Sequence, residues 1–238
     1  MIGAFLLQLS LFTTLYSPNQ EWNEKTYSRG IVFIPLIGLI LGLMLYTSYY
    51  FLPVFLRGFT LVALYCILSG GLHLDGFSDT LDGILARRGA VRALEIMKDP
   101  HLGTFGILGL FLLLIAYFSY FPLLGRNLIL LPALGRFGGM LAGYRNSYAR
   151  QEGMGKFFIN SLHGNVIFIW MIILSILAYY LGSTCSLLSL NITFVYSFFG
   201  GRWFKNHLGG MTGDTVGFMI ESSQLFYIIL FLLVKQWI

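Results

Sequence analysis

Long apolar stretches alternate with short polar segments along this 238-residue chain. Each stretch is near the ~20 residues that an α-helix needs to cross the hydrocarbon core of a bilayer, although some are a little short. The pattern therefore predicts about seven transmembrane helices joined by short loops. The apolar runs are Ile31–Tyr46, Val54–Gly70, Thr104–Phe121, Leu128–Tyr144, Val166–Leu181, Leu187–Gly201 and Thr215–Val234.

The first apolar segment, Phe5–Tyr16, is too short to cross a bilayer, and we expect an interfacial or re-entrant helix there. The connecting segments leave no room for a separate soluble domain, so residues 1–238 are expected to form one membrane-embedded domain. The predicted fold class is all-α, a polytopic integral membrane helical bundle.

Composition and charge agree with this class. Hydrophobic residues make up 57% of the chain and charged residues only 11%. Most lysines and arginines fall on alternate connecting segments, which the positive-inside rule places in the cytoplasm. The net charge of +5 reflects this topology and does not indicate nucleic-acid binding. The cations on these segments are Lys25, Arg29, Arg87, Arg88, Arg92, Lys98, Arg145, Arg150, Lys156, Arg202 and Lys205.

Three carboxylates stand in the segment that follows the second apolar run. Asp75, Asp79 and Asp82 are spaced i, i+4 and i+7, which on a helix is an arc of about 60°. Carboxylates on one stripe repel each other unless a cation lies between them. Oxygen ligands without a nearby cysteine favour Mg²⁺, or Mn²⁺, over Zn²⁺. We predict that the three bind a metal; solvated acids on a helical turn are the alternative.

Other polar residues flank this segment. His73 is a candidate general base or metal neighbour, and equally a packed histidine. Arg87 suits phosphate binding, although basic residues beside membrane spans also serve topology. Lys98 and Asp99 precede a glycine-containing helix start that could hold an anion, but an aspartate there is also typical of a helix cap.

Two charged residues lie inside apolar runs, where they must face the bundle or a polar cavity. They are Arg136 and Glu221. Asp214 and Glu221 are seven residues apart and so share one helical face. We predict that the final run packs beside the Asp-bearing segment, with Glu221 either near the metal or paired with Arg136.

The polar loop from Tyr144 to Lys156 contributes two further candidates, Arg150 and Lys156. Its glycines ahead of a lysine are only loosely similar to a phosphate-binding loop, because the Walker spacing is absent. A mixture of aromatic and basic residues suits a nucleotide or a ribose, and a solvated cytoplasmic loop is the alternative.

A divalent metal held by carboxylates, with basic groups of phosphate-binding type, suits phosphoryl transfer. The segment Asp79–Arg87 reproduces the first half of the signature of CDP-alcohol phosphotransferases, but the second half is absent. That family is therefore the runner-up. An ion-coupled transporter is a further alternative, disfavoured because the acids cluster at one membrane face.

Four separated motifs give a closer match. They are Gly70–Gly83, Lys98–Gly106, Tyr148–Gly155 and Gly213–Gly217. In this order, and in a membrane context, they resemble the cobalamin synthase family, the adenosylcobinamide-GDP ribazoletransferases of prokaryotes. The resemblance covers nearly the whole chain.

The resemblance implies a magnesium-dependent phosphotransferase formed by a single catalytic domain, residues 1–238. The ribose hydroxyl of α-ribazole, or of its 5′-phosphate, attacks the cobinamide-side phosphoryl group of adenosylcobinamide-GDP. GMP leaves, and adenosylcobalamin or its 5′-phosphate is formed, which is the last stage of nucleotide loop assembly in cobalamin biosynthesis. The implied location is the prokaryotic plasma (inner) membrane, with the site facing the cytoplasm. A homo-oligomer stays possible.

The predicted site has two groups of residues. The catalytic group is His73, Asp75, Asp79 and Asp82, of which the three aspartates bind the metal. The substrate-binding group is Arg87, Lys98, Asp99, Arg136, Arg150, Lys156, Asp214 and Glu221.

Overall fold

The computed structural model describes residues 1–18 and 20–237, and over these residues the chain is helical, with one isolated bridge between Tyr148 and Met211 and no strand. The predicted all-α class is confirmed. The helices are α1 (Ile2–Phe12), α2 (Glu24–Gly30), η1 (Ile31–Phe33), α3 (Ile34–Phe51), α4 (Val54–Ser69), α5 (Leu72–Leu85), α6 (Gly89–Ile96), α7 (Thr104–Leu124), α8 (Asn127–Gly143), α9 (Met154–Asn160), α10 (Gly164–Leu208) and α11 (Gly213–Trp237).

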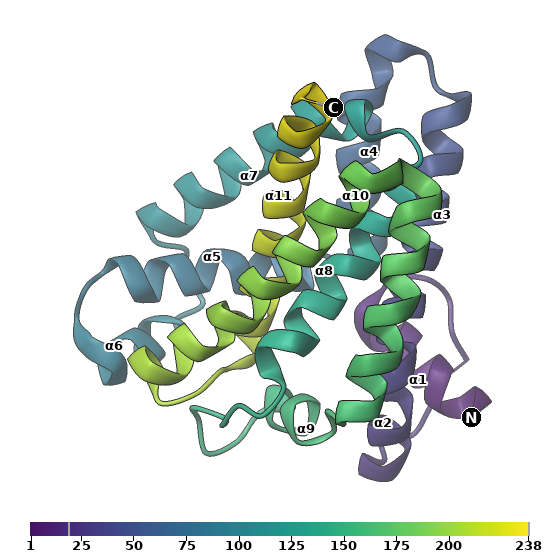
Figure 1. Cartoon of the computed structure of the whole chain (residues 1–238). Helices are drawn as coiled ribbons and strands as arrows, with labels where there is room; N and C mark the ends of the chain where they lie inside the picture. The colour runs from purple at the N-terminus through teal and green to yellow at the C-terminus, as the bar shows by residue number, and fades with distance from the viewer. Residues whose placement is uncertain (19, 238) are drawn as a thin grey trace.

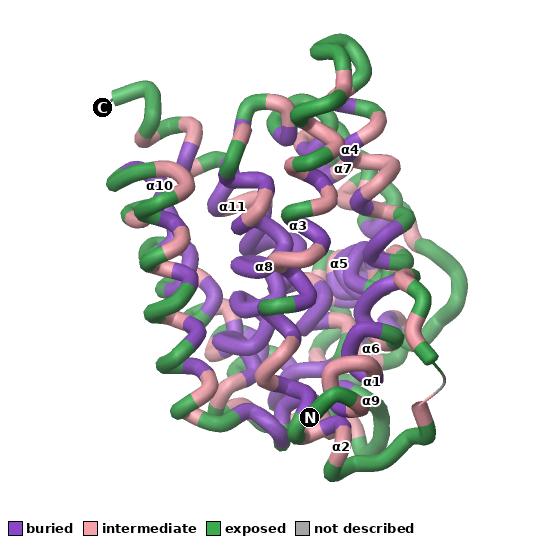
Figure 2. Tube along the Cα trace, turned by 90° about the vertical axis from the view of Figure 1, so that its right-hand side faces the viewer, coloured by how far each residue is buried: buried purple, intermediate pink, exposed green. Residues whose placement is uncertain are grey.

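Helix α8 forms the centre of the bundle. Nearly all of its residues are buried, and it packs against α3, α10 and α11 (Figure 2). Glycines permit the closest of these contacts: a Cβ added at Gly38 of α3 would lie 2.5 Å from Cα of Ala133. Small residues bring helix backbones together in this way where lipid, and not water, surrounds the bundle.

Every predicted apolar run is helical, but the lengths of the helices differ. Four are long and apolar enough to cross a membrane: Glu24–Phe51, Thr104–Leu124, Gly164–Leu208 and Gly213–Trp237. Helices α4 and α5 form a bent pair that would supply a fifth span. Helix α8 has only 17 residues. The multi-pass character is therefore established, while the count of about seven stays a prediction.

Helix α10 contains two of the predicted runs. Its 45 residues would extend over about 68 Å, twice the hydrocarbon thickness, if it were straight. The backbone leaves helical geometry at Gly182 and at Ser183, whose φ is 61°. Figure 1 shows the chain turning back at this point, so that the helix forms two arms.

A second break positions the candidate site. Gly70 and Gly71 have φ angles of 64° and 72°, which glycine adopts without the steric cost of a Cβ. They turn the chain so that α5 lies at 92° to α4. Helix α5 then runs across the bundle and packs against α7 and α11 (Figure 1).

The short helices α1, α2, α6 and α9 lie at the same end of the bundle (Figure 1). Helix α1 has 11 residues and contacts α2 and α3, as suits the non-spanning helix predicted for the N-terminal segment. The C-terminus lies at the opposite end.

Candidate functional site

The candidate site is built where α5 crosses the start of α11. A Cβ added at Gly76 would lie 2.9 Å from Cα of Asp214, and one at Gly217 would lie 3.1 Å from the backbone oxygen of His73. The two backbones are therefore in direct contact. The prediction that the final apolar run packs beside the Asp-bearing segment is confirmed.

This crossing brings together carboxylates from both helices. Asp79 is partly buried and lies within electrostatic range of Asp75, Asp82 and Asp214. Arg150 provides the opposing charge, with Nη2 2.7 Å from Oδ2 of Asp214. Crowded carboxylates disfavour the fully ionised state unless a cation joins them. The structure thus assembles Asp75, Asp79, Asp214 and Arg150, which come from three separate motifs.

The loop that carries Arg150 is held against the segment before α11. The backbone amide of Ala149 donates to the oxygen of Met211 at 2.9 Å, and the amide of Met211 donates to the oxygen of Ser147 at 2.8 Å. Gly153 has a φ of 140° and lies against the hydroxyl of Tyr148. Burial raises the pKa of the Tyr148 hydroxyl above its ordinary value. The loop is therefore fixed in place, and Arg150 with it.

Asp82 has a different role from the one that its spacing suggests. It is buried, and its two carboxylate oxygens accept hydrogen bonds from the backbone amides of Gly103 and Gly106, at 2.8 and 2.9 Å. These amides belong to the start of α7, where free N–H groups and the helix dipole favour a negative charge. Asp82 is the cap of α7, and it joins the second motif to the first.

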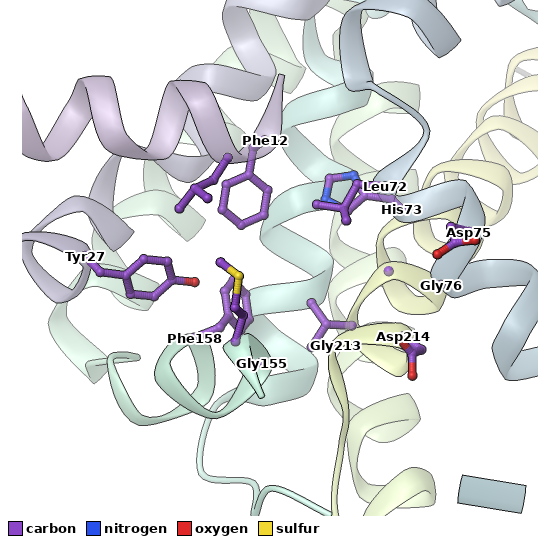
Figure 3. Close-up of a pocket in the computed structure, with 14 residues that line it drawn as sticks. Phe12, Tyr27, Leu72, His73, Asp75, Gly76, Gly155, Phe158, Gly213 and Asp214 are labelled. Carbon is purple, nitrogen blue, oxygen red and sulfur yellow. The ribbon is translucent and has the colours of Figure 1, made fainter. Parts of the chain in front are cut away.

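A partly enclosed cavity of about 170 Å³ lies beside the crossing, between α5, α11, α1 and α9. Figure 3 shows aromatic side chains on one side of it, the carboxylates of Asp75 and Asp214 on the other, and the His73 ring between them. His73 is 3% exposed, and within residues 1–18 and 20–237 neither of its ring nitrogens has a hydrogen-bond partner. The cavity lining is Leu11, Phe12, Tyr27, Leu72, His73, Asp75, Gly76, Met154, Gly155, Phe158, Gly213, Asp214, Val216 and Gly217.

A second, more polar cleft of about 470 Å³ lies between α6 and the Arg150 loop. Lys98, Glu95, Glu152 and Arg150 line it. Because Arg150 borders this cleft and also pairs with Asp214, the cleft and the carboxylate group adjoin. The two cations of this cleft are matched by two carboxylates, so the phosphate-binding role of Lys98 stays a prediction.

The remaining predicted binding residues lie outside the carboxylate group. Arg87 is exposed, with a φ of 52°. Lys156 is also exposed, and its Nζ donates to the backbone oxygen of Gln151. Asp99 accepts hydrogen bonds from the backbone and ring of His101, which lower the pKa of its carboxyl group. Asp99 therefore stabilises a turn before α7 and does not cap that helix, whose N-cap residue is Gly103.

Glu221 and Arg136 are fully buried inside the bundle. Glu221 accepts hydrogen bonds from the hydroxyls of Tyr65 and Tyr117, at 2.6 and 2.7 Å, and from the amide of Gln224 at 3.3 Å. Nη1 of Arg136 donates to the backbone oxygen of Pro132. Among the described residues these two form no direct ion pair, and neither lines the cavity beside the crossing.

Three partners of this buried network could not be recognised in the sequence. Tyr65, Tyr117 and Gln224 lie in apolar runs where tyrosine and glutamine carry no spacing signal. The aromatic lining of the cavity, Phe12 and Tyr27, is likewise hidden among many other aromatic residues. The only indication in the sequence was Glu221 itself, because burying a carboxylate without a hydrogen-bond or charge partner in a membrane span is costly.

No group of three or more histidine, cysteine, aspartate or glutamate side chains within residues 1–18 and 20–237 is arranged to hold a metal ion. A complete protein cage is not required for Mg²⁺, which usually takes one or two carboxylates together with waters and substrate phosphates. Asp75 and Asp79, one helical turn apart on α5, fit that mode.

Comparison with known proteins decides the family. The model of the cobalamin-5-phosphate synthase family matches residues 4–232. The chain belongs to this family. Among its curated relatives are proteins named adenosylcobinamide-GDP ribazoletransferase. The one from Acetivibrio thermocellus is 37% identical over 97% of both chains, and the one from Alkaliphilus oremlandii is 35% identical over 98% of both. The relative from Citrobacter koseri is 37% identical over 95% of both chains. No solved structure matches.

The family membership confirms the resemblance drawn from the four motifs. All four motifs of the sequence meet around α5: the second through the Asp82 cap, the third through Arg150, and the fourth through the Gly76–Asp214 contact. Family members are transferases of cobalamin synthesis, which agrees with an enzymatic site and not with a transporter.

Proposed function

We propose that the protein transfers the cobinamide-phosphate group of adenosylcobinamide-GDP to α-ribazole or its 5′-phosphate. The ribose hydroxyl oxygen forms the new bond to phosphorus, and the bond from phosphorus to the GMP oxygen breaks. The hydroxyl proton passes to a carboxylate in the cavity wall, where Asp75 and Asp214 lie. The observation that carries the proposal is the meeting of these carboxylates with Arg150 in a chain of this family.

The chain supplies two kinds of groups for this reaction. Arg150 and Lys98 border one cleft and would bind the phosphates of the nucleotide substrate. Arg150 is only 14% exposed and is fixed by its loop, so it can hold a phosphate in one geometry. Positioning and charge neutralisation account for most catalysis in phosphoryl transfer.

Magnesium, with manganese as the alternative, would be held by Asp75 and Asp79. The fit rests on the crowding of carboxylates around Asp79, which a divalent cation relieves. A bound ion supplies charge stabilisation to the phosphates and to the departing GMP. Asp82, whose oxygens are bonded to the α7 amides, supports this group through its charge and through the position of α7.

We propose that the site faces the cytoplasm from a bacterial inner membrane. Eleven of the fifteen lysines and arginines, those on alternate connecting segments, support this orientation, because such residues are retained on the cytoplasmic side. Arg150 and Lys98 of the candidate site are among them.

The decisive experiment is release of GMP by the purified, detergent-solubilised chain. Adenosylcobinamide-GDP and α-ribazole are supplied with Mg²⁺, and the products are separated by chromatography. We expect GMP and a cobalamin product in equal amounts, and no product after addition of EDTA. A CDP-activated alcohol serves as the competing substrate. Turnover of that substrate alone, with release of CMP, would contradict the proposal.

A further inference from the structure

The cavity beside the α5–α11 crossing is divided into an apolar part and a polar edge. Phe12, Tyr27 and Phe158 belong to the apolar part. Asp75 and Asp214 form the polar edge (Figure 3). A ligand that fills the whole cavity therefore has one apolar, aromatic portion and one polar portion that reaches the carboxylates.

His73 lies between the two parts, and its ring nitrogens have no hydrogen-bond partner among the described residues. It is 3% exposed, and its ring is 5.7 Å from the ring of Phe12, centroid to centroid, with the planes inclined by 34°. Buried polar groups are nearly always hydrogen-bonded, because leaving one unpaired is costly. A neutral imidazole offers one donor and one acceptor, and neither is used here. The geometry indicates a hydrogen bond to a bound ligand.

Glycines form the floor between the two parts of the cavity. Gly76, Gly213 and Gly217 all line it, and a Cβ added at Gly213 would meet no atom within 4 Å. The Cβ positions of Gly76 and Gly217 are taken up by the contact between α5 and α11, so the open space at Gly213 is the part of this floor that can receive a sugar ring.

We propose that this cavity binds the flat, fused-ring base of the nucleoside substrate, with His73 donating a hydrogen bond to the ring nitrogen of the base that carries no sugar. The base packs against Phe12, the ribose lies over the glycine floor, and a ribose hydroxyl reaches the edge with Asp75 and Asp214. This assignment rests on the proposed function, since it is the nucleoside of that reaction that has such a base. It gives His73 a role in substrate selection and not in proton abstraction.

The first measurement compares two nucleosides on the unmodified protein. One is α-ribazole, and the other is its carbon isostere, in which a C–H group replaces the free ring nitrogen. Loss of one buried hydrogen bond should raise KM for the isostere about 10- to 100-fold, with kcat changed little. Equal KM values for the two nucleosides would overturn the assignment.

The second measurement uses the variant His73→Phe, which keeps a ring of similar size but removes both nitrogens. We expect its KM for α-ribazole to rise to the value of the isostere, so that the variant no longer distinguishes the two. His73→Asn, which retains a donor, should recover part of the discrimination and also serves if the Phe variant fails to fold. The matched control is His163→Phe at an exposed position, which should leave both KM values unchanged.

Two results would separate this assignment from the others considered for His73. If His73 were a general base, His73→Phe would lower kcat with both nucleosides and leave the KM ratio unchanged. If it were a packed histidine, the variant would change neither quantity. Both results contradict the assignment.

Equilibrium dialysis of labelled α-ribazole, without the nucleotide substrate, tests the cavity apart from turnover. Binding that depends on His73 in a protein that releases no GMP would sustain the cavity assignment and contradict the proposed function.

Discussion

Acidic residues that look alike in the sequence have three different environments in the structure. Asp75 and Asp79 lie on the face of α5 that meets Asp214 and Arg150. Asp82 caps a helix, and Glu221 is enclosed by tyrosine hydroxyls. Of these four residues, only Asp75 and Asp79 have carboxylate oxygens that accept no hydrogen bond from the described part of the chain. We therefore expect mutations at these residues to have different consequences.

The pair on α5 is expected to affect turnover. Asp75→Asn and Asp79→Asn should each lower kcat by at least ~100-fold, on the scale of losing an electrostatic stabiliser of the transition state. The unfolding temperature should change little, because neither carboxylate supports another element. GMP release at saturating Mg²⁺ measures the first effect, and thermal unfolding in detergent measures the second.

The control for this pair is Glu24→Gln, at an exposed carboxylate in the first turn of α2. It removes one exposed negative charge that belongs neither to the carboxylate group nor to the cavity lining, and it should leave kcat unchanged. Near-normal turnover in both aspartate variants would remove the basis for the metal proposal.

Glu221 is expected to affect stability. Glu221→Gln replaces charge-assisted hydrogen bonds from Tyr65 and Tyr117 with neutral ones, at a cost of about 1–2 kcal/mol. The unfolding temperature should fall, while the Mg²⁺ concentration for half-maximal rate should stay the same. A variant that folds as stably as the parent but requires far more Mg²⁺ would instead assign Glu221 to the site.

At this scale the sequence could indicate which residues matter but not what each contacts. The spacing of Asp75, Asp79 and Asp82 placed them on one face of a helix. It could not show that α7 begins directly above Asp82, because that contact joins residues 21 and 24 positions apart. The partners of Glu221 were hidden for the same reason, since Tyr65 lies 156 positions away.

Among the helices, α7 depends on a residue from another helix for its cap. Gly103, its N-cap residue, has no side chain to accept the first amides of the helix, and Asp82 supplies both acceptors. Asp82→Ala should destabilise the protein by about 1–2 kcal/mol, as expected for loss of a helix cap. Asp82→Asn, which keeps one acceptor, should cost less. Thermal unfolding of the three proteins measures this order; equal stability of all three would contradict the capping role.

The contact between α5 and α11 depends on the absence of a side chain at Gly76. The variant Gly76→Ala would place a methyl group 2.9 Å from backbone atoms of Asp214, so the two helices must separate. We expect a loss of turnover of about tenfold or more, because a displacement near 1 Å of catalytic groups has effects of this size or larger.

Gly58→Ala is the matched control for the helix contact. It would place a methyl group 2.8 Å from the backbone oxygen of Phe118, in the contact between α4 and α7. It should lower the unfolding temperature but have a smaller effect on turnover than Gly76→Ala. If the two variants lose turnover equally, the α5–α11 contact has no special part in assembling the site.

The elements themselves were largely predictable, because apolar run length and glycine position are local features. Each of the seven runs is helical, and the Gly70–Gly71 break stands where the motif begins. The direction of α5 after the break was not predictable. A break permits many angles, and packing against α7 and α11 selects the observed 92°.

The whole molecule has its termini at opposite ends (Figure 1), which requires an odd number of membrane crossings if both ends lie outside the bilayer. By length alone four or five helices qualify. The two arms of α10, together with α4 and the short, buried α8, would complete the seven predicted from the apolar runs. The distribution of the charges could be read from the sequence. The position of α8 could not, because its 17 residues are short for a membrane span and are accommodated by burial inside the bundle.

The distribution of lysines and arginines predicts which end of the molecule faces the cytoplasm. Ala90 lies in α6 and Gln151 in the Arg150 loop, whereas Thr184 directly follows the break at Gly182 and Ser183. The turn between the two arms of α10 lies toward the opposite end of the molecule (Figure 1). Single cysteines at these positions are introduced after Cys66 and Cys185 have been replaced. In intact bacterial cells an impermeant thiol reagent should label the cysteine at 184 but not those at 90 or 151, which should react only after lysis. Position 151 lines the cleft beside the candidate site, and position 90 lies in α6, which forms the other wall of that cleft. Labelling of either in intact cells would therefore contradict the orientation and move the site to the outer face. Labelling at 184 under the same conditions shows that the reagent reaches the membrane surface, so protection of the other two cannot be ascribed to failure of the reagent.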